Sequence, residues 1–237
     1  MRKRTNQLIL ILLLTGTSLQ SGQNQAEVNH RLDLVLEKKE ANGIRAVNAE
    51  FVFASGDKIR FRFRSAINGY LYVMDQGSSG TWRQLYPRDE LTQSRRVAAG
   101  KDYLVPAAGS GWFQVSGPAG YDNVYFLISP MDLGKSLPAA SQPPPDDAGS
   151  QAAAAAAFAT ATPRCDDELF RSHGECLDTS AGLKPLGKNE ALPDKLAQLP
   201  AQTSRDLIVV DNAKDTSVSS TEPFEEPSIF RFRIAHK

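Results

Sequence analysis

A strict alternation of charged and apolar residues between positions 58 and 64 constrains the fold of this chain more than any other feature. Ile59, Phe61 and Phe63 lie on one side of an extended chain. The opposite side carries Lys58, Arg60, Arg62 and Arg64. A period of two is what a β-strand with one buried face requires. The pattern therefore predicts a strand whose apolar face belongs to a hydrophobic core.

The residues after this strand predict a turn and a second strand. Gly69 ends a short polar stretch, and we expect it to supply the positive φ of a tight turn. Residues 70–74 are aromatic and apolar on both faces, which favours a position inside a sheet. Tyr70 and Tyr72 share one face of that second strand.

Short apolar runs recur at intervals of roughly ten residues from position 32 to position 130, separated by turn residues. Pro87 and Pro106 each follow such a run, where a ladder N–H is no longer needed. Two runs flank Gly100, which predicts a hairpin or a bulged strand there. This organisation predicts an all-β fold, an antiparallel Ig-like or Greek-key β-sandwich.

Composition divides the chain into four parts. Residues 1–26 have a basic start and an apolar run, the layout of a signal peptide. Residues 27–135 hold the predicted β-sandwich module. Residues 136–203 are rich in proline and alanine, which predicts a long disordered or weakly helical linker or insertion. Residues 204–237 regain strand character, and we expect a last pair of strands to dock on the sandwich, because two strands alone are not stable in water.

The leader predicts export to the periplasm or the extracellular space. Its apolar run is shorter than the ~20 residues that span a bilayer, so we expect no transmembrane segment after cleavage; an uncleaved anchor is the alternative. The chain has 27 basic and 27 acidic groups, and residues 1–26 include three of the basic ones. A slightly acidic mature protein has no general attraction to nucleic acid, so we expect no such partner.

Cys165 and Cys176 are the only two cysteines of the chain. In an exported protein an even number favours a disulfide, which here would close a loop of about ten residues. The alternative is a metal site formed by both cysteines, His173 and one of the acidic residues at 166–168. The cysteine spacing is not that of a standard zinc site. We therefore expect a disulfide, with no metal or other cofactor.

An ordered series of short motifs between positions 50 and 130 resembles a known family. The motifs are Phe53-x-Ser55-Gly56-Asp57, Ile59-x-Phe61-x-Phe63, Asn68-Gly69-Tyr70-Leu71-Tyr72-Val73, Gly77-Ser78-Ser79-Gly80, Leu85-Tyr86-Pro87, Gly100-x-x-Tyr103-x-Val105-Pro106 and Gly117-Pro118-x-Gly120. Together they resemble the bacterial domain of unknown function 4384. Domains of this type occur in exported proteins and beside caspase-like peptidase or protein-kinase modules. The resemblance implies an accessory module and brings no catalytic residues.

The family-motif residues also have structural explanations as turn formers, strand ends and strand residues. We expect a structural role for Gly56, Asp57, Gly69, Tyr70, Tyr72, Pro87 and Pro106.

The chain contains three histidines and none of the common hydrolase, metalloprotease or nucleotide-binding motifs. Aspartates such as Asp75 and Asp122 are expected at turns, where this residue is common. An acid pair for glycoside hydrolysis stays open as a possibility. We therefore expect no enzyme.

Two groups of residues are candidates for binding. The cations of the first strand, spaced about 7 Å apart, could meet phosphate, an anionic polysaccharide or an acidic partner. Their alternative role is a solvated face that prevents edge-to-edge association, neutralised by acids elsewhere. Trp82 and Trp112 could stack on carbohydrate, or could belong to the core.

The sequence thus predicts a secreted, non-catalytic β-sandwich module with a binding or accessory role in the bacterial cell envelope. Its partner would be an unknown envelope protein or polymer. An enzyme acting on envelope polymers and a carbohydrate-binding module are the alternatives.

Overall fold

The structure is a computed structural model, and it describes only part of the chain. The described residues are 30–78, 80–88, 94–107, 109, 111–134, 162–165, 168, 172–173, 175–184, 186, 196, 208–212, 215–220 and 224–237. The predicted signal peptide and most of the predicted linker lie outside them. Among the described residues, no helix has the length and apolar character needed to cross a membrane.

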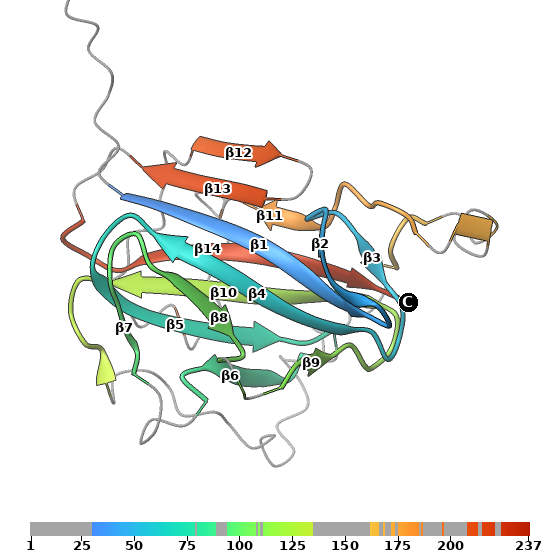
Figure 1. The fold of residues 1–237 in the computed structure, drawn as a ribbon, viewed down its shortest axis with the longest axis horizontal. Coiled ribbons are helices and arrows are strands. Elements are labelled where there is room, and N and C mark those ends of the chain that lie inside the picture. The colour runs from blue at the N-terminus through green and yellow to red at the C-terminus, as the bar shows by residue number, and fades with distance from the viewer. Residues whose placement is uncertain are drawn as a thin grey trace, which may run out of the picture.

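Every element bounded within the described residues is a strand, and the strands form two sheets (Figure 1). We call the first one sheet A; its strands are β1 (His30–Glu40), β2 (Gly43–Val47), β4 (Lys58–Ser65), β8 (Asp102–Val105), β9 (Phe113–Gln114), β12 (Ile208–Asn212) and β13 (Asp215–Ser220). Their order is β12-β13-β1-β4-β8, with β2 beside β1 and β9 beside β4. All these pairs are antiparallel.

We call the second one sheet B. Its strands are β3 (Val52–Phe53), β5 (Gly69–Gln76), β6 (Trp82–Tyr86), β7 (Arg96–Val97), β10 (Gly120–Ser129), β11 (Gly182–Lys184) and β14 (Ser228–His236). Their order is β11-β14-β10-β5-β6, with β3 beside β14 and β7 beside β5. Only the pair of β3 with β14 is parallel among the pairs described. The predicted all-β antiparallel sandwich is confirmed.

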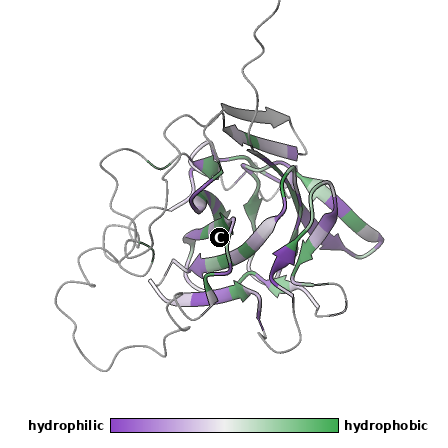
Figure 2. Cartoon of the chain, turned by 90° about the vertical axis from the view of Figure 1, so that its left-hand side faces the viewer, coloured by the Kyte–Doolittle hydropathy of each residue, from purple (hydrophilic) through white to green (hydrophobic). Residues whose placement is uncertain are grey.

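The main core lies between the two sheets, and apolar and polar residues alternate along several of the strands that enclose it (Figure 2). Ile59, Phe61 and Phe63 of β4 are at most 3% exposed, as the alternation predicts. The ring of Phe61 meets Phe126 and Phe232 of sheet B edge-on, with ring centres 5.2 and 5.7 Å apart. These aromatic contacts join the two layers.

The outer face of sheet B carries a second apolar cluster, because β5 and β10 are apolar on both faces. Its members are Tyr72, Met74, Tyr125, Leu127, Leu133, Leu186, Leu196 and Ile229. Leu186 and Leu196 belong to the segment that the sequence presents as a linker, yet both are buried. The same segment supplies β11, which pairs with β14. Leu186, Leu196 and β11 of this segment therefore pack on the sandwich.

The region around Gly100 is not the hairpin or bulged strand that the sequence predicts. β7 pairs with β5 in sheet B, whereas β8 pairs with β4 in sheet A. The chain thus crosses from one sheet to the other at Gly100, whose φ is 72°. Two strands as short as β7 and β8 are not stable as an isolated pair. Each pairs instead with the edge of a longer strand, β5 or β4.

Gly69 also differs from expectation, because it is not among the glycines with positive φ. It is the first residue of β5, and a Cβ at this position would lie 2.8 Å from the carbonyl oxygen of Ser129 in β10. Glycine is required here by the close approach of two backbones, not by the turn.

Three strands, not two, follow the insertion in the described residues, and they enter different sheets. β14 lies inside sheet B, between β10 and β11, and its end lies beside β3 (Figure 1). The hairpin of β12 and β13 extends sheet A along β1. β13 escaped prediction because its sequence, Asp-Thr-Ser-Val-Ser-Ser, is almost wholly polar.

Candidate functional site

The charged face of β4 is part of the outer face of sheet A, where β1 and β8 flank it. The outward positions of these three strands are Arg31, Asp33, Val35, Glu37, Lys39, Lys58, Arg60, Arg62, Arg64, Asp102 and Leu104. Six of these side chains are cationic and three are carboxylates. The face is therefore positive, although the chain as a whole is neutral.

Glu37 of β1 binds two of the four predicted cations. Its carboxylate accepts hydrogen bonds from Nε of Arg60 at 2.6 Å and from Nε of Arg62 at 3.0 Å. Although it belongs to an outer face, Glu37 is only 7% exposed. One carboxylate shared by two guanidinium groups gives a cluster that holds both arginines in place and keeps a positive charge.

Arg64 is paired as well, at the far end of β4. Its Nε and Nη2 atoms donate to the two carboxylate oxygens of Asp102, at 2.7 and 2.9 Å. The hydrogen bond from Arg64 lowers the pKa of Asp102, and the same bond raises the pKa of Arg64. Both side chains are exposed, so salt will screen this pair.

Lys58 differs from the other three cations, because no ion pair joins it to another described residue. The four cations expected to act together are thus divided by the structure. Arg60, Arg62 and Arg64 are held by acids of the neighbouring strands, and Lys58 projects from the end of β4.

The two tryptophans lie apart: Trp82 belongs to β6 of sheet B, whereas Trp112 directly precedes β9 of sheet A. The guanidinium carbon of Arg60 lies 4.5 Å from the centre of the Trp112 ring, so a cation covers that ring. Trp82 of β6 stacks on Tyr125, with ring centres 5.5 Å apart, on the outer face of sheet B. Both rings are partly buried and neither belongs to the main core.

The family-motif residues lie at turns, strand ends and packed positions. At the turn before β4, Gly56 has a φ of 90°, and the Asp57 carboxylate accepts from the Ala54 N–H at 3.0 Å and from Lys38 Nζ at 2.7 Å. Pro87 and Pro106 directly follow β6 and β8.

The two motif tyrosines point to the outer face of sheet B. The Tyr72 hydroxyl donates to Asp132 at 2.8 Å and accepts from the Leu133 N–H at 2.9 Å, so it ties β5 to the turn after β10. Burial and the hydrogen bond with Asp132 raise the pKa of Tyr72. Tyr70 packs partly buried against the same cluster.

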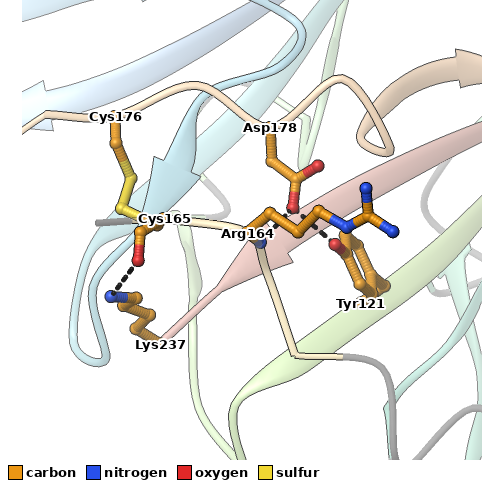
Figure 3. Close-up of a disulfide and its surroundings, with 6 residues drawn as sticks. All are labelled: Tyr121, Arg164, Cys165, Cys176, Asp178 and Lys237. Atoms are coloured by element: carbon orange, nitrogen blue, oxygen red, sulfur yellow. Dashed lines mark hydrogen bonds between the residues drawn. A yellow bond between two sulfur atoms is a disulfide. The ribbon is translucent and has the colours of Figure 1, made fainter. Parts of the chain in front are cut away.

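The disulfide connects two segments of the insertion beside the end of β14 (Figure 3). Cys165 and Cys176 are bonded, with Cα atoms 6.0 Å apart, which confirms the predicted pair. Both sulfur atoms are used in this bond, so the alternative metal site loses its two thiolate ligands. The Lys237 Nζ atom donates to the carbonyl oxygen of Cys165 at 3.3 Å.

Asp178 anchors the same loop to the sandwich (Figure 3). It is 2% exposed, and its carboxylate accepts from the Tyr121 hydroxyl at 2.5 Å and the Arg164 N–H at 2.6 Å. Burial and the bond with Asp178 raise the pKa of Tyr121 to about 12. The hydrogen bonds from Tyr121 and the backbone lower the pKa of Asp178 against the opposing effect of burial. This arrangement fastens a loop.

A second group of titratable residues lies at one end of the main core. The pairing of β5, β10 and β14 places Asp75, Asp122 and His236 on their inner faces. His236 is 1% exposed, and its Nε2 atom lies 3.3 Å from Asp122 Oδ1. Asp122 also accepts from the Ser78 N–H at 2.6 Å. Burial and the charge of Asp122 raise the pKa of Asp75 to about 7, while Arg83 and His236 oppose this.

This group was not predicted from the sequence, and the expectation that Asp75 and Asp122 lie at turns was wrong, since both lie within strands. A signal was present: in β5 the inward positions are Leu71, Val73 and then Asp75, so the pattern places a carboxylate where a core residue is expected. The alternation of inward and outward side chains continues past Val73, so Asp75 also points inward.

Comparison with known families finds one match. Residues 52–132 match the family model for a domain of unknown function, DUF4384, which confirms the resemblance drawn from the motifs. The match spans about a third of the chain. No curated protein and no solved structure matches. The matched segment supplies β3 to β10, whereas β1 and β14, which lie inside the two sheets, come from outside it.

Proposed function

Because residues 52–132 form a domain of unknown function 4384 inside a larger sandwich, we propose that this chain is an exported, non-catalytic accessory module of the bacterial cell envelope. It binds an anionic envelope polymer through the outer face of sheet A. The observation that carries this proposal is the excess of cations over carboxylates on the outward positions of β1, β4 and β8. The leader sequence supports the export step.

The arrangement of the arginines suits a repeating anion. Glu37 engages the Nε atoms of Arg60 and Arg62, and a guanidinium group has five N–H donors, so each arginine keeps donors for another acceptor. The ion pairs fix both side chains before any ligand arrives, which reduces the entropy lost on binding. A polymer that follows β4 would meet a cation about every 7 Å.

The contacts of the two tryptophan rings favour this proposal over stacking on neutral carbohydrate. Arg60 covers the ring of Trp112, and Tyr125 covers the ring of Trp82. A carbohydrate-binding platform uses exposed aromatic faces, which these contacts reduce.

The test is retention of the full exported chain on immobilised polymers. We expect retention on poly(glycerol phosphate) and weaker retention on polygalacturonate, lost as salt rises from low to physiological concentration, because the contacts join exposed charges. Neutral dextran is the control and should retain nothing. If neither anionic polymer retains the protein at low salt, the proposal is wrong.

An enzyme acting on envelope polymers is the second candidate, and one observation favours it. Asp75, with a pKa of about 7, lies in the same group as the acid Asp122 and the buried His236. A carboxylic acid with a raised pKa is a typical general acid. Incubation with each polymer, followed by mass analysis of released fragments, separates the candidates. Cleavage by the wild type that Asp75→Asn abolishes would establish the enzyme and overturn the non-catalytic module.

A further inference from the structure

Four exposed side chains form a row across the end of sheet A. The register places Ile44 of β2 opposite Lys39 of β1, Lys39 opposite Lys58 of β4, and Lys58 opposite Gln114 of β9. All four are exposed, and Ile44 is 53% exposed. Two lysines on neighbouring strands therefore occupy the centre of an exposed row.

The acids near this row are already engaged by other cations. Glu37 binds Arg60 and Arg62. Asp57 binds Lys38 at 2.7 Å, and Glu40 binds Arg45 at 2.7 Å. Within the described part of the chain, no ion pair reaches Lys39 or Lys58.

Like charges directly opposite each other on neighbouring strands destabilise a sheet. The opposed pair Lys39–Lys58 therefore destabilises the free protein. No acid among the described residues forms an ion pair with either lysine. An anion placed between the two ammonium groups would remove that repulsion. Directly opposed Cβ atoms are about 5 Å apart, so two lysine side chains can converge on one anion.

The two lysines are compatible with a phosphate group. A guanidinium group matches a carboxylate or a phosphate in two parallel hydrogen bonds, and on this face the arginines already bind the protein's own carboxylates, Glu37 and Asp102. The ammonium group of lysine is a compact point charge that binds phosphate without a planar partner. The row thus offers two lysine ammonium groups to the ligand, beside arginines that keep N–H donors of their own.

We propose that Lys39 and Lys58 bind a phosphate ester group of the polymer, with Gln114 beside them as a further donor; this inference depends on the proposed function above and names its subsite. Ile44 flanks Lys39 with an apolar surface against which the carbon backbone of such a polymer can lie. Arg60 is the next outward cation along β4 and is available for the following repeat unit.

The experiment compares two double variants of the full exported chain. Lys39→Gln with Lys58→Gln removes the proposed subsite. Arg96→Gln with Lys101→Gln removes the same charge from exposed positions away from the row and is the matched control. The dissociation constant for poly(glycerol phosphate) is measured at low salt by biolayer interferometry, with polygalacturonate as the second ligand.

We expect the subsite variant to lose about tenfold or more in affinity for the phosphate polymer, and the control to lose about twofold or less. The thermal midpoint of the subsite variant should equal or exceed that of the wild type, because the repulsion is gone. Equal losses in both variants, while the wild type binds, would overturn the subsite and leave the proposed function standing. A wild type that binds neither polymer would overturn both. Equal losses on both polymers would exclude selectivity for phosphate and overturn this inference.

Discussion

The Nε atom of Arg60 lies 2.6 Å from a carboxylate oxygen of Glu37, and the other oxygen of the same carboxylate binds Arg62. These residues come from neighbouring strands, β1 and β4. Reversing the charge of the arginines would therefore place acids around a nearly buried acid and endanger the fold. The informative change is on the glutamate.

Replacing Glu37 by glutamine should lower stability and strengthen polymer binding. Stability falls because two guanidinium groups lose a charged acceptor, at a cost of about 1–3 kcal/mol in the free energy of unfolding. Binding improves because the face loses a negative charge. Urea unfolding and the polymer dissociation constant measure the two effects. Asp33→Asn is the control: its pair with Arg31 is exposed, and its loss should cost less than about 1 kcal/mol. Equal stability changes in both variants would contradict the role assigned to Glu37.

Stability should depend on pH through Asp75. Its pKa in the folded protein is about 7, against 3.8 for the ordinary group, so the folded state holds the proton more tightly. The contribution of Asp75 to the free energy of unfolding is therefore greatest below pH 4, and it declines as pH rises towards 7. Asp122, Arg83 and His236 are the groups that interact with it. Asp75→Asn should remove this decline, so the variant should exceed the wild type in stability at pH 8 by up to a few kcal/mol.

Urea unfolding at pH 5 and pH 8 tests this expectation with both proteins. Because the variant and the wild type share every other titratable group, the quantity to compare is the difference between them. A difference that stays constant between the two pH values would show that Asp75 ionises as an ordinary exposed carboxylate does.

Opening the disulfide should loosen the insertion without unfolding the sandwich. Replacing Cys165 and Cys176 by serine should lower the free energy of unfolding by about 2–3 kcal/mol, because the cross-link restricts the unfolded chain. Limited proteolysis followed by mass analysis should show new cuts between residues 162 and 180, while β1 to β10 stay protected. Global loss of protection would mean that the loop is required for the core. Asp178→Asn, which keeps the disulfide, separates the effect of the cross-link from that of the Tyr121 hydrogen bond.

Export predicts a processed amino terminus. N-terminal sequencing of the protein from its native host should give a first residue between Leu19 and Glu27, and fractionation should place it outside the cytoplasm. Intact Met1 in a cytoplasmic fraction would contradict export and with it the envelope role.

The sequence by itself determined the strand at β4, the turn before it, the disulfide and the all-β class. These features follow from local rules: the side-chain period of a strand, the backbone freedom of Gly56, and an even number of cysteines. Even the division of β4 into a buried aromatic face and a charged face could be derived before any contact was known. Local rules also gave the cations of the candidate site.

The tertiary structure alone decided what those cations can do. Glu37 meets Arg60 because the register of β1 on β4 places them opposite each other, and register depends on pairing between distant segments. For the same reason, the sequence could not predict that Lys39 lies opposite Lys58 or that the chain crosses between the sheets at Gly100. It also could not predict that Asp75, Asp122 and His236 meet from three strands. A period of two tells which face a side chain lies on. Which side chain lies beside it is set only when the sheets assemble.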